Sequence, residues 1–534
     1  MTGNYPVARS SMEAYSFVKQ ERGELAQLVD RGLLPWWSDP ELHAVGFRPL
    51  GSGLLLLDHR AELTPLSKHV HTLAWWFLLL FGYALLAHVL FPKRIATVGL
   101  FLYALSPVHA VPIGWIANRV SVASTALAVF TVFGHVWWRS GHGRAGLWIA
   151  VASGISSVLT SEYGLGVYAF LVAYELTRRD RTSLRVFAVV AVSTAAYLAL
   201  RSGCGAGVVG SVMYTDPLVE PAEFLSGFAA RVPALVLQLF FQVPCEFSAG
   251  ILSASTLKLR AVSLALVLAP AIIATVWLTK RRRTEAWLLA ATFGAIIPLL
   301  SVEPNARLLQ LPAVGTSLTV AAVTCRLFSL MSKVRLARTL AATVAAIVLT
   351  VIHLPLAAAL TLSSSSAWFW TAKVAQERVD NDRIFAGGRG SCFVLLNARD
   401  IVSLYSVPQM LSRQLGAPPD CWFALASSSG RVQVSRSATN SLMVTASPGA
   451  ALLDSPISQF VRVPKFTRNQ MDDKTKRVFG RMAARVRTAA NGEPTQVQFD
   501  FSGNALLNRV TLLHASRSGF RVVPTPAVGG TVSD

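Results

Sequence analysis

Apolar runs long enough to cross the roughly 30 Å hydrocarbon core of a lipid bilayer recur in this sequence from Val70 to Leu362. Of all residues, 53% are hydrophobic and only 14% are charged. In a soluble globular protein about a quarter of the residues are charged. The sequence therefore predicts a polytopic α-helical membrane protein.

The positive charge of the chain is distributed as this class of protein requires. The formal net charge of +21 would by itself be compatible with nucleic-acid binding. Much of the excess, however, lies in short clusters between the apolar runs, namely Lys93-Arg94, 139–144, 178–185, 280–283 and 326–338. Such clusters are typical of cytoplasmic loops. We therefore expect a multi-pass protein of a bacterial inner membrane, with the membrane and no nucleic acid among its partners.

Taking the basic clusters as the cytoplasmic side predicts about ten crossings. The expected spans are 70–91, 95–112, 120–138, 146–159, 164–174, 187–200, 261–278, 287–300, 309–330 and 340–362. The fourth and fifth are short and form a hairpin that turns at Ser161-Glu162. Counting 232–241 as a span would place the cluster at 280–283 outside, so we expect this segment to be re-entrant or interfacial.

The sequence divides into three parts that differ in their distribution of apolar and polar residues. In the last part, Val497, Phe499 and Phe501 alternate with polar residues, which is the pattern of a half-buried strand, and a helix is expected from Asp400 to Leu415. We expect an outer-face N-terminal segment, a multispan transmembrane domain and an extracytoplasmic α+β domain, at residues 1–68, 69–363 and 364–534 respectively.

Four of the five cysteines fall on the predicted outer side, where disulfides can form. Cys392 and Cys421 lie close together in the C-terminal domain and are expected to be bonded to each other. Cys204 and Cys245 are a weaker second pair. Cys325 falls at the inner end of a span and should be a reduced thiol.

The same topology gathers polar groups at the outer boundary, each with a functional and a structural interpretation. Glu162, at the tip of the hairpin, is a functional carboxylate with Arg119 as candidate partner, or it marks a membrane exit. Arg48 holds a lipid pyrophosphate bidentately, or it is an anchor at the interface. Asp58, followed by His59, is a general base or one half of a helix-surface pair.

Further candidates flank the short segments between predicted spans. His109 and Arg119 enclose a segment too short to span, which lines a substrate groove or is an ordinary loop. Glu303 and Arg307 line the same side or form a local ion pair. The histidines have no convincing metal-ligand spacing, so we name no metal ligand, although a divalent metal stays possible. No Gly-x-Ser-x-Gly elbow and no Walker loop occurs, which disfavours hydrolysis of esters or amides and ATP-driven transport.

Several short motifs in this order resemble those of the multispan glycosyltransferases of the GT-C superfamily, especially bacterial relatives of the protein O-mannosyltransferases and the transmembrane mannosyltransferases. They are Phe47-Arg48-Pro49-Leu50, Ser106-Pro107-Val108-His109, Trp115-Ile116-Ala117-Asn118-Arg119 and Ser161-Glu162. The resemblance covers roughly residues 34 to 330. The chain begins inside what resembles the family's first outer loop, so the family's first span and paired acids have no counterpart here. Asp39 and Glu41 lie late in that loop and do not replace those acids.

The resemblance implies transfer of a sugar from a polyprenyl-phosphate carrier to a lipid, glycan or protein acceptor at the outer face of the inner membrane. It implies Glu162 and Asp58 as catalytic carboxylates, with Arg48, Arg119 and Arg307 holding the carrier phosphate. His109 and Glu303 would support the groove. If so, the side chains of Arg48, His109, Arg119, Glu162 and Arg307 converge in the fold, with Glu162 within reach of Arg119 or of the Arg48 loop. The alternatives are a catalytically inactive membrane scaffold that displays the outer domain and, third, a transporter.

Overall fold

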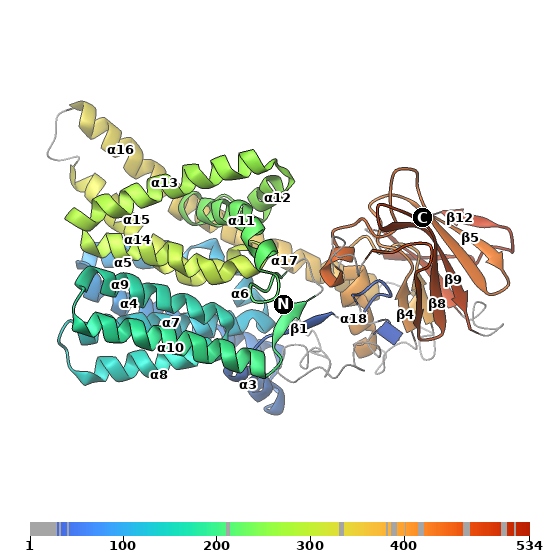
Figure 1. Cartoon of the computed structure of the whole chain (residues 1–534), viewed down its shortest axis with the longest axis horizontal. Coiled ribbons are helices and arrows are strands. Elements are labelled where there is room, and N and C mark those ends of the chain that lie inside the picture. The colour runs from blue at the N-terminus through green and yellow to red at the C-terminus, as the bar shows by residue number, and fades with distance from the viewer. Residues whose placement is uncertain are drawn as a thin grey trace.

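A bundle of helices and a sheet-rich domain make up the protein, as the computed structural model shows (Figure 1). The structure describes residues 29–30, 32, 34–39, 42–209, 214–330, 336–380, 383–385, 392–400, 402–414, 421–462, 470–502, 510–516 and 519–533. The predicted combination of apolar helices with a C-terminal domain of mixed structure is confirmed. We call the end of the bundle toward the sheet domain the domain-facing end.

The bundle is built from long helices joined by short turns. Its principal helices are α3 (Pro49–Arg60), α4 (Pro65–Leu90), α5 (Lys93–Ala104), α6 (Ala110–Gly114), α7 (Arg119–Arg139), α8 (Arg144–Thr160), α9 (Val167–Arg178), α10 (Arg181–Gly203), α11 (Pro221–Phe241), α12 (Cys245–Ala254), α13 (Leu257–Arg281), α14 (Arg283–Ile296), α15 (Gln310–Leu330), α16 (Leu336–Val351) and α17 (Ala357–Asp380). In the described chain, eight helices are long and apolar enough to span a membrane, or nine if the bent pair formed by α5 and the segment to Gly114 counts as one. The count of about ten crossings stays a prediction.

Small residues bring α7 and α8 into close contact. A Cβ atom on Gly134 would lie 2.7 Å from the carbonyl oxygen of Gly146, and one on Gly146 would lie 2.7 Å from that of Gly134. The Ser124 and Ser157 hydroxyls each donate to the other residue's carbonyl oxygen, at 2.9 and 2.8 Å. Small residues and interhelical hydrogen bonds are the means by which membrane helices associate, since lipid gives them little hydrophobic reason to do so.

The segment expected to be re-entrant lies in α11, which is itself long and apolar enough to count among the candidate spans. Contacts on both sides of the segment 232–241 lie near the domain-facing end. Arg231, in the middle of the helix, donates to the carbonyl oxygen of Leu300, and Glu246 at the start of α12 accepts from the backbone N–H of Ala306 at 3.0 Å. Both partners lie in the connection between α14 and α15. The re-entrant course stays a prediction, and these contacts favour it.

A continuous helical segment connects the bundle to the sheet domain. α16 passes through a π-helical turn, η6 (Ile352–Leu356), into α17, which continues past the serine run at 363–366 to Asp380. The predicted boundary at residue 364 therefore falls inside a helix. In Figure 1 this helix runs out of the bundle and ends against the sheet domain.

The sheet domain contains two sheets around one core. The four-stranded sheet has the order β11 (Gly519–Val523), β10 (Val510–Ser516), β3 (Cys392–Leu395), β4 (Cys421–Ala424); β10, β3 and β4 run parallel. The six-stranded antiparallel sheet has the order β12 (Thr531–Ser533), β5 (Val432–Ala438), β6 (Ser441–Ala446), β9 (Glu493–Phe501), β8 (Met482–Ala490), β7 (Lys476–Phe479). The predicted alternation holds, because Val497, Phe499 and Phe501 are buried in β9. A helix, α18 (Val407–Gln414), lies between β3 and β4 in the sequence, within the region predicted to be helical.

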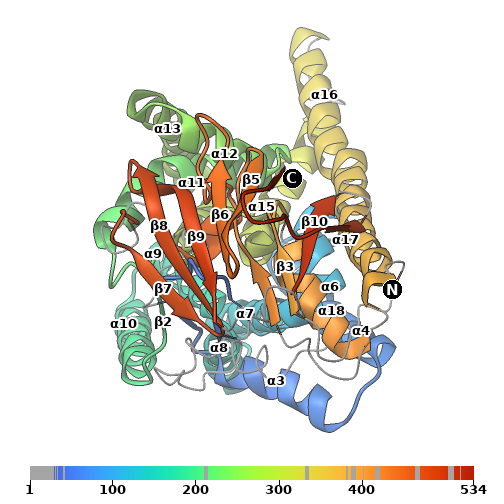
Figure 2. The same cartoon turned by 90° about the vertical axis from the view of Figure 1, so that its right-hand side faces the viewer.

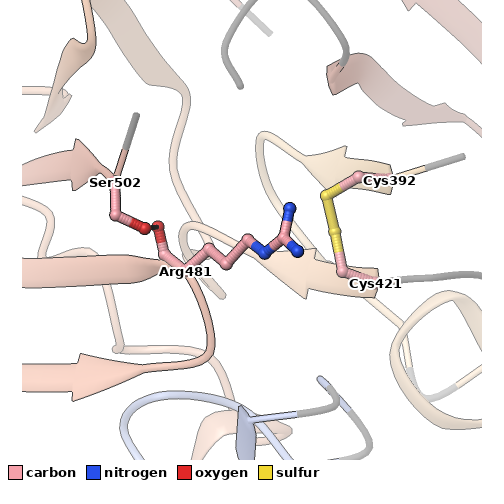
Figure 3. The surroundings of a disulfide bond; sticks show 4 residues. All are labelled: Cys392, Cys421, Arg481 and Ser502. Carbon is pink, nitrogen blue, oxygen red and sulfur yellow. Dashed lines mark hydrogen bonds between the residues drawn. A yellow bond between two sulfur atoms is a disulfide. The ribbon is translucent and has the colours of Figure 1, made fainter. Parts of the chain in front are cut away.

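The cysteine predictions had mixed outcomes. Cys392 and Cys421 are directly opposite each other in the β3–β4 register and form the predicted disulfide, with Cα atoms 4.5 Å apart. Figure 3 shows this bond with the Arg481 side chain directed toward it. The pair Cys204 and Cys245 was wrong, because both are free thiols, one exposed and one buried. Cys325 is also free, as predicted.

The N-terminal segment also contacts the sheet domain. Trp36 and Trp37 are buried in the core of that domain, and the Trp36 indole N–H donates to the carbonyl oxygen of Leu425 at 3.2 Å. Asp39 is buried beside them, whereas Glu41 lies outside the described residues. The chain then pairs strand β1 (His43–Val45) with β2 (Gly207–Val209) and enters α3. The domain is thus held at two places, by this segment and by α17.

Candidate functional site

A cavity of about 360 Å³ opens at the domain-facing end of the bundle. Its wall is formed by the segment before α3, the turn between α8 and α9, the end of α10, the loop before α11 and the connection after α14. The polar residues of the wall are Arg48, Glu162, Tyr163, Tyr197, Arg201, Tyr214, Thr215, Asp216 and Ser301. The predicted candidates Arg48 and Glu162, 114 positions apart (162 minus 48), therefore line one cavity.

Glu162 is the first residue of the 3₁₀ turn η3 (Glu162–Gly166), because α8 ends at Thr160 and the chain becomes extended at Ser161. The backbone N–H of Phe47 donates to its Oε1 at 3.3 Å. Glu162 therefore reaches the Arg48 loop, as expected. Its side chain keeps 32% of its surface exposed, so the carboxylate is accessible from the cavity.

The expected partnership of Glu162 with Arg119 was wrong; Arg201, at the carboxyl end of α10, takes that place. Arg201 Nε lies 3.5 Å from Glu162 Oε1, and Arg201 Nη2 donates to Asp216 Oδ2 at 2.6 Å. Asp216 is buried, and its Oδ1 accepts from the backbone N–H of Leu218 at 3.0 Å. One guanidinium is thus held between a buried and an accessible carboxylate.

Sequence reasoning missed Arg201 and Asp216. A signal for Arg201 was present, since it ends an apolar helix on the side where few arginines are expected. Asp216 had none, because it lies in an irregular loop whose course is set by tertiary contacts. The backbone N–H of Thr215 donates to the carbonyl oxygen of Ser301 at 2.7 Å, and Tyr214 pairs with Val302 in an isolated bridge.

Three tyrosines complete the polar wall. The Tyr197 hydroxyl donates to the carbonyl oxygen of Phe47 at 3.3 Å and so fixes the segment that contains Arg48. Burial raises the pKa of Tyr163 to about 12, although the nearby charges of Arg48 and Arg307 act in the opposite direction. Tyr163 is therefore a neutral hydroxyl at physiological pH and can donate a hydrogen bond.

Arg307 and Glu303 lie beside the cavity without lining it. The Arg307 guanidinium stacks over the Trp115 ring, 5.1 Å from its centroid. Glu303 does not pair with Arg307; it accepts instead from Arg231 at 3.1 Å. Arg231 also contacts the Thr215 hydroxyl, which belongs to the cavity wall. The expected local pair of Glu303 and Arg307 is therefore replaced by a pair that supports the wall.

Asp58 and Arg119 form a separate, closed group that we call the Asp58 group, with His71, Thr72 and Lys68. Arg119 has no exposed side-chain surface and donates from Nη1 to Asp58 Oδ2, from Nε to Thr72 at 2.9 Å, and from Nη2 to the Lys68 carbonyl oxygen at 2.7 Å. His71 Nδ1 lies 2.7 Å from Asp58 Oδ1. The structure therefore places these two candidates in a ring of contacts that joins α3, α4 and α7, away from the cavity wall.

His109 is also apart from the cavity. Its ring is buried, lies edge-on to Tyr103 with centroids 4.7 Å apart, and meets the Gln310 side chain at 3.3 Å. Of the five side chains expected to converge, the structure brings Arg48 and Glu162 together in the cavity wall and places Arg307 beside it, whereas His109 and Arg119 lie elsewhere. Among the described residues, no group of three or more His, Cys, Asp or Glu side chains is placed to hold a metal ion.

Comparison with known proteins gives a weak structural similarity. No protein-family profile matches the sequence, and no curated protein matches it significantly. The apo oligosaccharyltransferase of Archaeoglobus fulgidus aligns with 73% of this chain at 16% identity and a TM-score of 0.39. The archaeal oligosaccharyltransferase AglB from the same organism, in complex with an inhibitory peptide and a dolichol-phosphate, aligns with 75% at 15% identity and a TM-score of 0.38. The alignments span 60% of the length of each of those two chains. Scores this low do not define a common fold.

Proposed function

We propose that this protein is a membrane glycosyltransferase of the GT-C type, which moves a sugar from a polyprenyl-phosphate carrier to an envelope acceptor at the domain-facing end of the bundle. The observation that carries the proposal is the cavity in which an accessible carboxylate, Glu162, shares a wall with Arg48 and Arg201. An accessible acid and two cations in one cavity match a reaction that removes a proton and releases an anion.

Glu162 is the general base in this proposal. It takes the proton of the acceptor hydroxyl while the acceptor oxygen forms a bond to the anomeric carbon of the sugar. The bond from that carbon to the phosphate oxygen breaks at the same time, and the carrier phosphate leaves with the electron pair. Arg201 supports this role because Asp216 holds its guanidinium in place, which keeps a positive charge beside the Glu162 carboxylate.

Arg48 binds the leaving phosphate in this scheme. Guanidinium groups match phosphate geometry bidentately, and the Tyr163 hydroxyl can add a neutral donor. The remaining wall is apolar and offers a surface for the first isoprene units of a carrier lipid. It includes Leu165, Leu198, Val208, Pro217, Leu218, Pro298 and Val302.

The proposal is tested by replacing Glu162 with Gln, which keeps the shape and removes the charge. Membranes that contain the full-length protein are incubated with decaprenyl-phosphate sugars carrying radiolabelled mannose, glucose or galactose, and label in the acceptor fraction is counted. We expect transfer by the native protein and none above background by E162Q. The matched control is E223Q, the same change at an exposed acid in the first turn of α11. Full transfer by E162Q would refute the proposal.

The second candidate is a catalytically inactive scaffold, which the double attachment of the sheet domain favours. Trp36 and Trp37 in its core and α17 at its side would hold the domain in a fixed position for a partner. In that case the native protein transfers no label from any of the three donors. The predicted orientation is tested separately: a reporter fused after Ser516 should be active only outside the cytoplasm.

A further inference from the structure

The six-stranded sheet has one apolar face in the core and one polar face toward solvent. Along β8, Met482, Ala484 and Val486 are buried, while Arg485 and Arg487, which alternate with them, are exposed. Figure 2, viewed from the domain side, shows β8, β9 and β6 in front with the helical bundle behind. The solvent face therefore points away from the bundle, and away from any membrane that the bundle spans.

The solvent face carries an excess of positive charge, and we call it the basic face. Its cations are Lys476 on β7 and Arg485 and Arg487 on β8. Lys476 lies directly opposite Arg485 in the register, although like charges in such a position destabilise a sheet. Among the residues that the structure describes, neither Lys476 nor Arg487 forms an ion pair with an acid. The arrangement leaves positive charge that an external anion can neutralise.

The neighbouring strands of the basic face present neutral polar groups. These are Gln433 on β5, Thr445 on β6, and Gln496 and Gln498 on β9. Arg487 donates to Gln498 Oε1 at 2.7 Å, and Gln496 donates to the Thr445 hydroxyl at 3.1 Å. Amides and hydroxyls in a flat array can exchange these contacts for hydrogen bonds with the hydroxyl groups of sugars.

The chain itself shows how this face holds a carboxylate. Asp500 on β9 accepts from Arg485, with a nitrogen 3.2 Å away, and from the Ser441 hydroxyl and the Gln498 amide, each at 2.6 Å. Partial burial would raise the pKa of Asp500, but these hydrogen bonds and the charges of Arg485 and Arg487 outweigh it and lower that pKa. The basic face thus stabilises an ionised carboxylate with a guanidinium, an amide and a hydroxyl.

We propose that the basic face binds a linear glycan whose sugars carry carboxylate groups. Lys476 and Arg487 take the carboxylates, and the Gln and Thr side chains of β5, β6 and β9 take the sugar hydroxyls. Arginine is suited to the first task because its planar guanidinium matches a carboxylate bidentately. This binding is independent of the sugar transfer proposed above, since it uses none of the cavity residues.

The test uses the full-length protein in nanodiscs of zwitterionic lipid and measures its affinity for polygalacturonate, a carboxylated glycan, by biolayer interferometry. K476Q/R487Q removes two charges from the basic face and keeps Arg485 beside Asp500. We expect about five- to tenfold weaker binding, because each exposed charge pair contributes modestly. The matched control, K373Q/R521Q, also removes one Lys and one Arg, but from α17 and β11, and should bind as the native protein does.

Three results would overturn the proposal. An equal loss in both double variants would assign the binding to net charge alone. Equal binding of neutral dextran would show that carboxylates are not required. Polyphosphate bound as tightly, with the same sensitivity to K476Q/R487Q, would assign the face to phosphates. The unfolding temperature of both variants is measured first, and retained stability makes each of these results decisive.

Discussion

Two groups of oppositely charged side chains lie at the domain-facing end of the bundle. They differ in whether a charged side chain remains accessible to a ligand. In the Asp58 group both charged side chains are almost fully buried and every charged end contacts protein. The second group, which we call the Glu162 group, consists of Glu162, Arg201 and Asp216. In it Arg201 and Asp216 are largely enclosed, but Glu162 keeps 32% of its surface exposed toward a cavity. The same residue types thus produce a closed contact in one place and an accessible one in the other.

The contacts of His71 make the closed character explicit. The Trp75 indole N–H lies 3.1 Å from His71 Nε2. His71 Nδ1 lies 2.7 Å from Asp58 Oδ1 and 2.8 Å from Arg119 Nη1. No donor or acceptor atom of the ring remains for a substrate. A general base needs an accessible lone pair, which Asp58 lacks and Glu162 has.

The largest expected effect concerns activity and separates the two groups directly. E162Q should lower the rate of sugar transfer by about 10²–10⁴-fold, the usual contribution of a general base, with less than about 1 kcal/mol lost in the free energy of unfolding. Transfer rates and unfolding temperatures of purified protein in nanodiscs provide both measurements. A large loss of stability with E162Q would mean that the Glu162 group is also a structural contact.

R119A should mainly change stability. It leaves Asp58 as a buried carboxylate without its cation and removes the donors to Thr72 and Lys68. Breaking a buried ion pair costs about 3–5 kcal/mol, so the yield of folded protein and the unfolding temperature should fall sharply. The protein that remains folded should keep its specific activity. A stable but inactive R119A protein would instead show that Arg119 is needed for sugar transfer and not for folding.

D216N should give an intermediate result, because Asp216 is buried like Asp58 but supports the cavity. Asn keeps an oxygen that can accept from the Leu218 N–H, while the charge that holds Arg201 is lost. We expect a stability loss of about 1–3 kcal/mol, as for an unpaired buried polar group, together with slower transfer. Denaturation in nanodiscs and the transfer assay test the two parts. An activity equal to that of native protein would remove Asp216 from the proposed mechanism.

The smallest effect belongs to an exposed acid at the opposite end of the bundle. A hydrogen bond from Arg139 is the main reason why the pKa of Asp180 is lowered from 3.8 to about 2. Because the folded value is below the unfolded one, the stabilisation is complete above pH 3.8 and disappears as the pH falls toward 2. Between pH 5 and pH 2.5 the unfolding temperature should fall slightly more for native protein than for D180N. Equal changes would contradict this assignment.

The sequence predicted the helices better than the contacts between them. Hydropathy identified the apolar helices and placed Glu162 at a turn, because both depend on local composition. The partner of Glu162 depends on how α3 and α10 pack. Asp58 and Glu162 both lie beside apolar runs, 61 and 43 positions from Arg119, and neither separation indicates which acid it meets. The sequence alternation of β9 was sufficient to predict a strand, but Asp216 could be placed only by the loop that presses against Ser301.

The continuous course of α16, η6 and α17 has a geometric consequence for the sheet domain. An α-helix rises about 1.5 Å and turns about 100° for each residue. If the N-terminal segment that contains Trp36 and Trp37 moves with the domain, the length of α17 therefore sets both the height of the domain and the direction in which its basic face points. Four inserted residues would raise the domain by about 6 Å and turn it by about 40°. Seven would raise it by about 10 Å and turn it by only about 20° in the other sense. The number of residues inserted before Asp380 therefore determines how far the domain moves from the bundle and how far it rotates about the helix axis, and different insertions combine the two changes in different proportions.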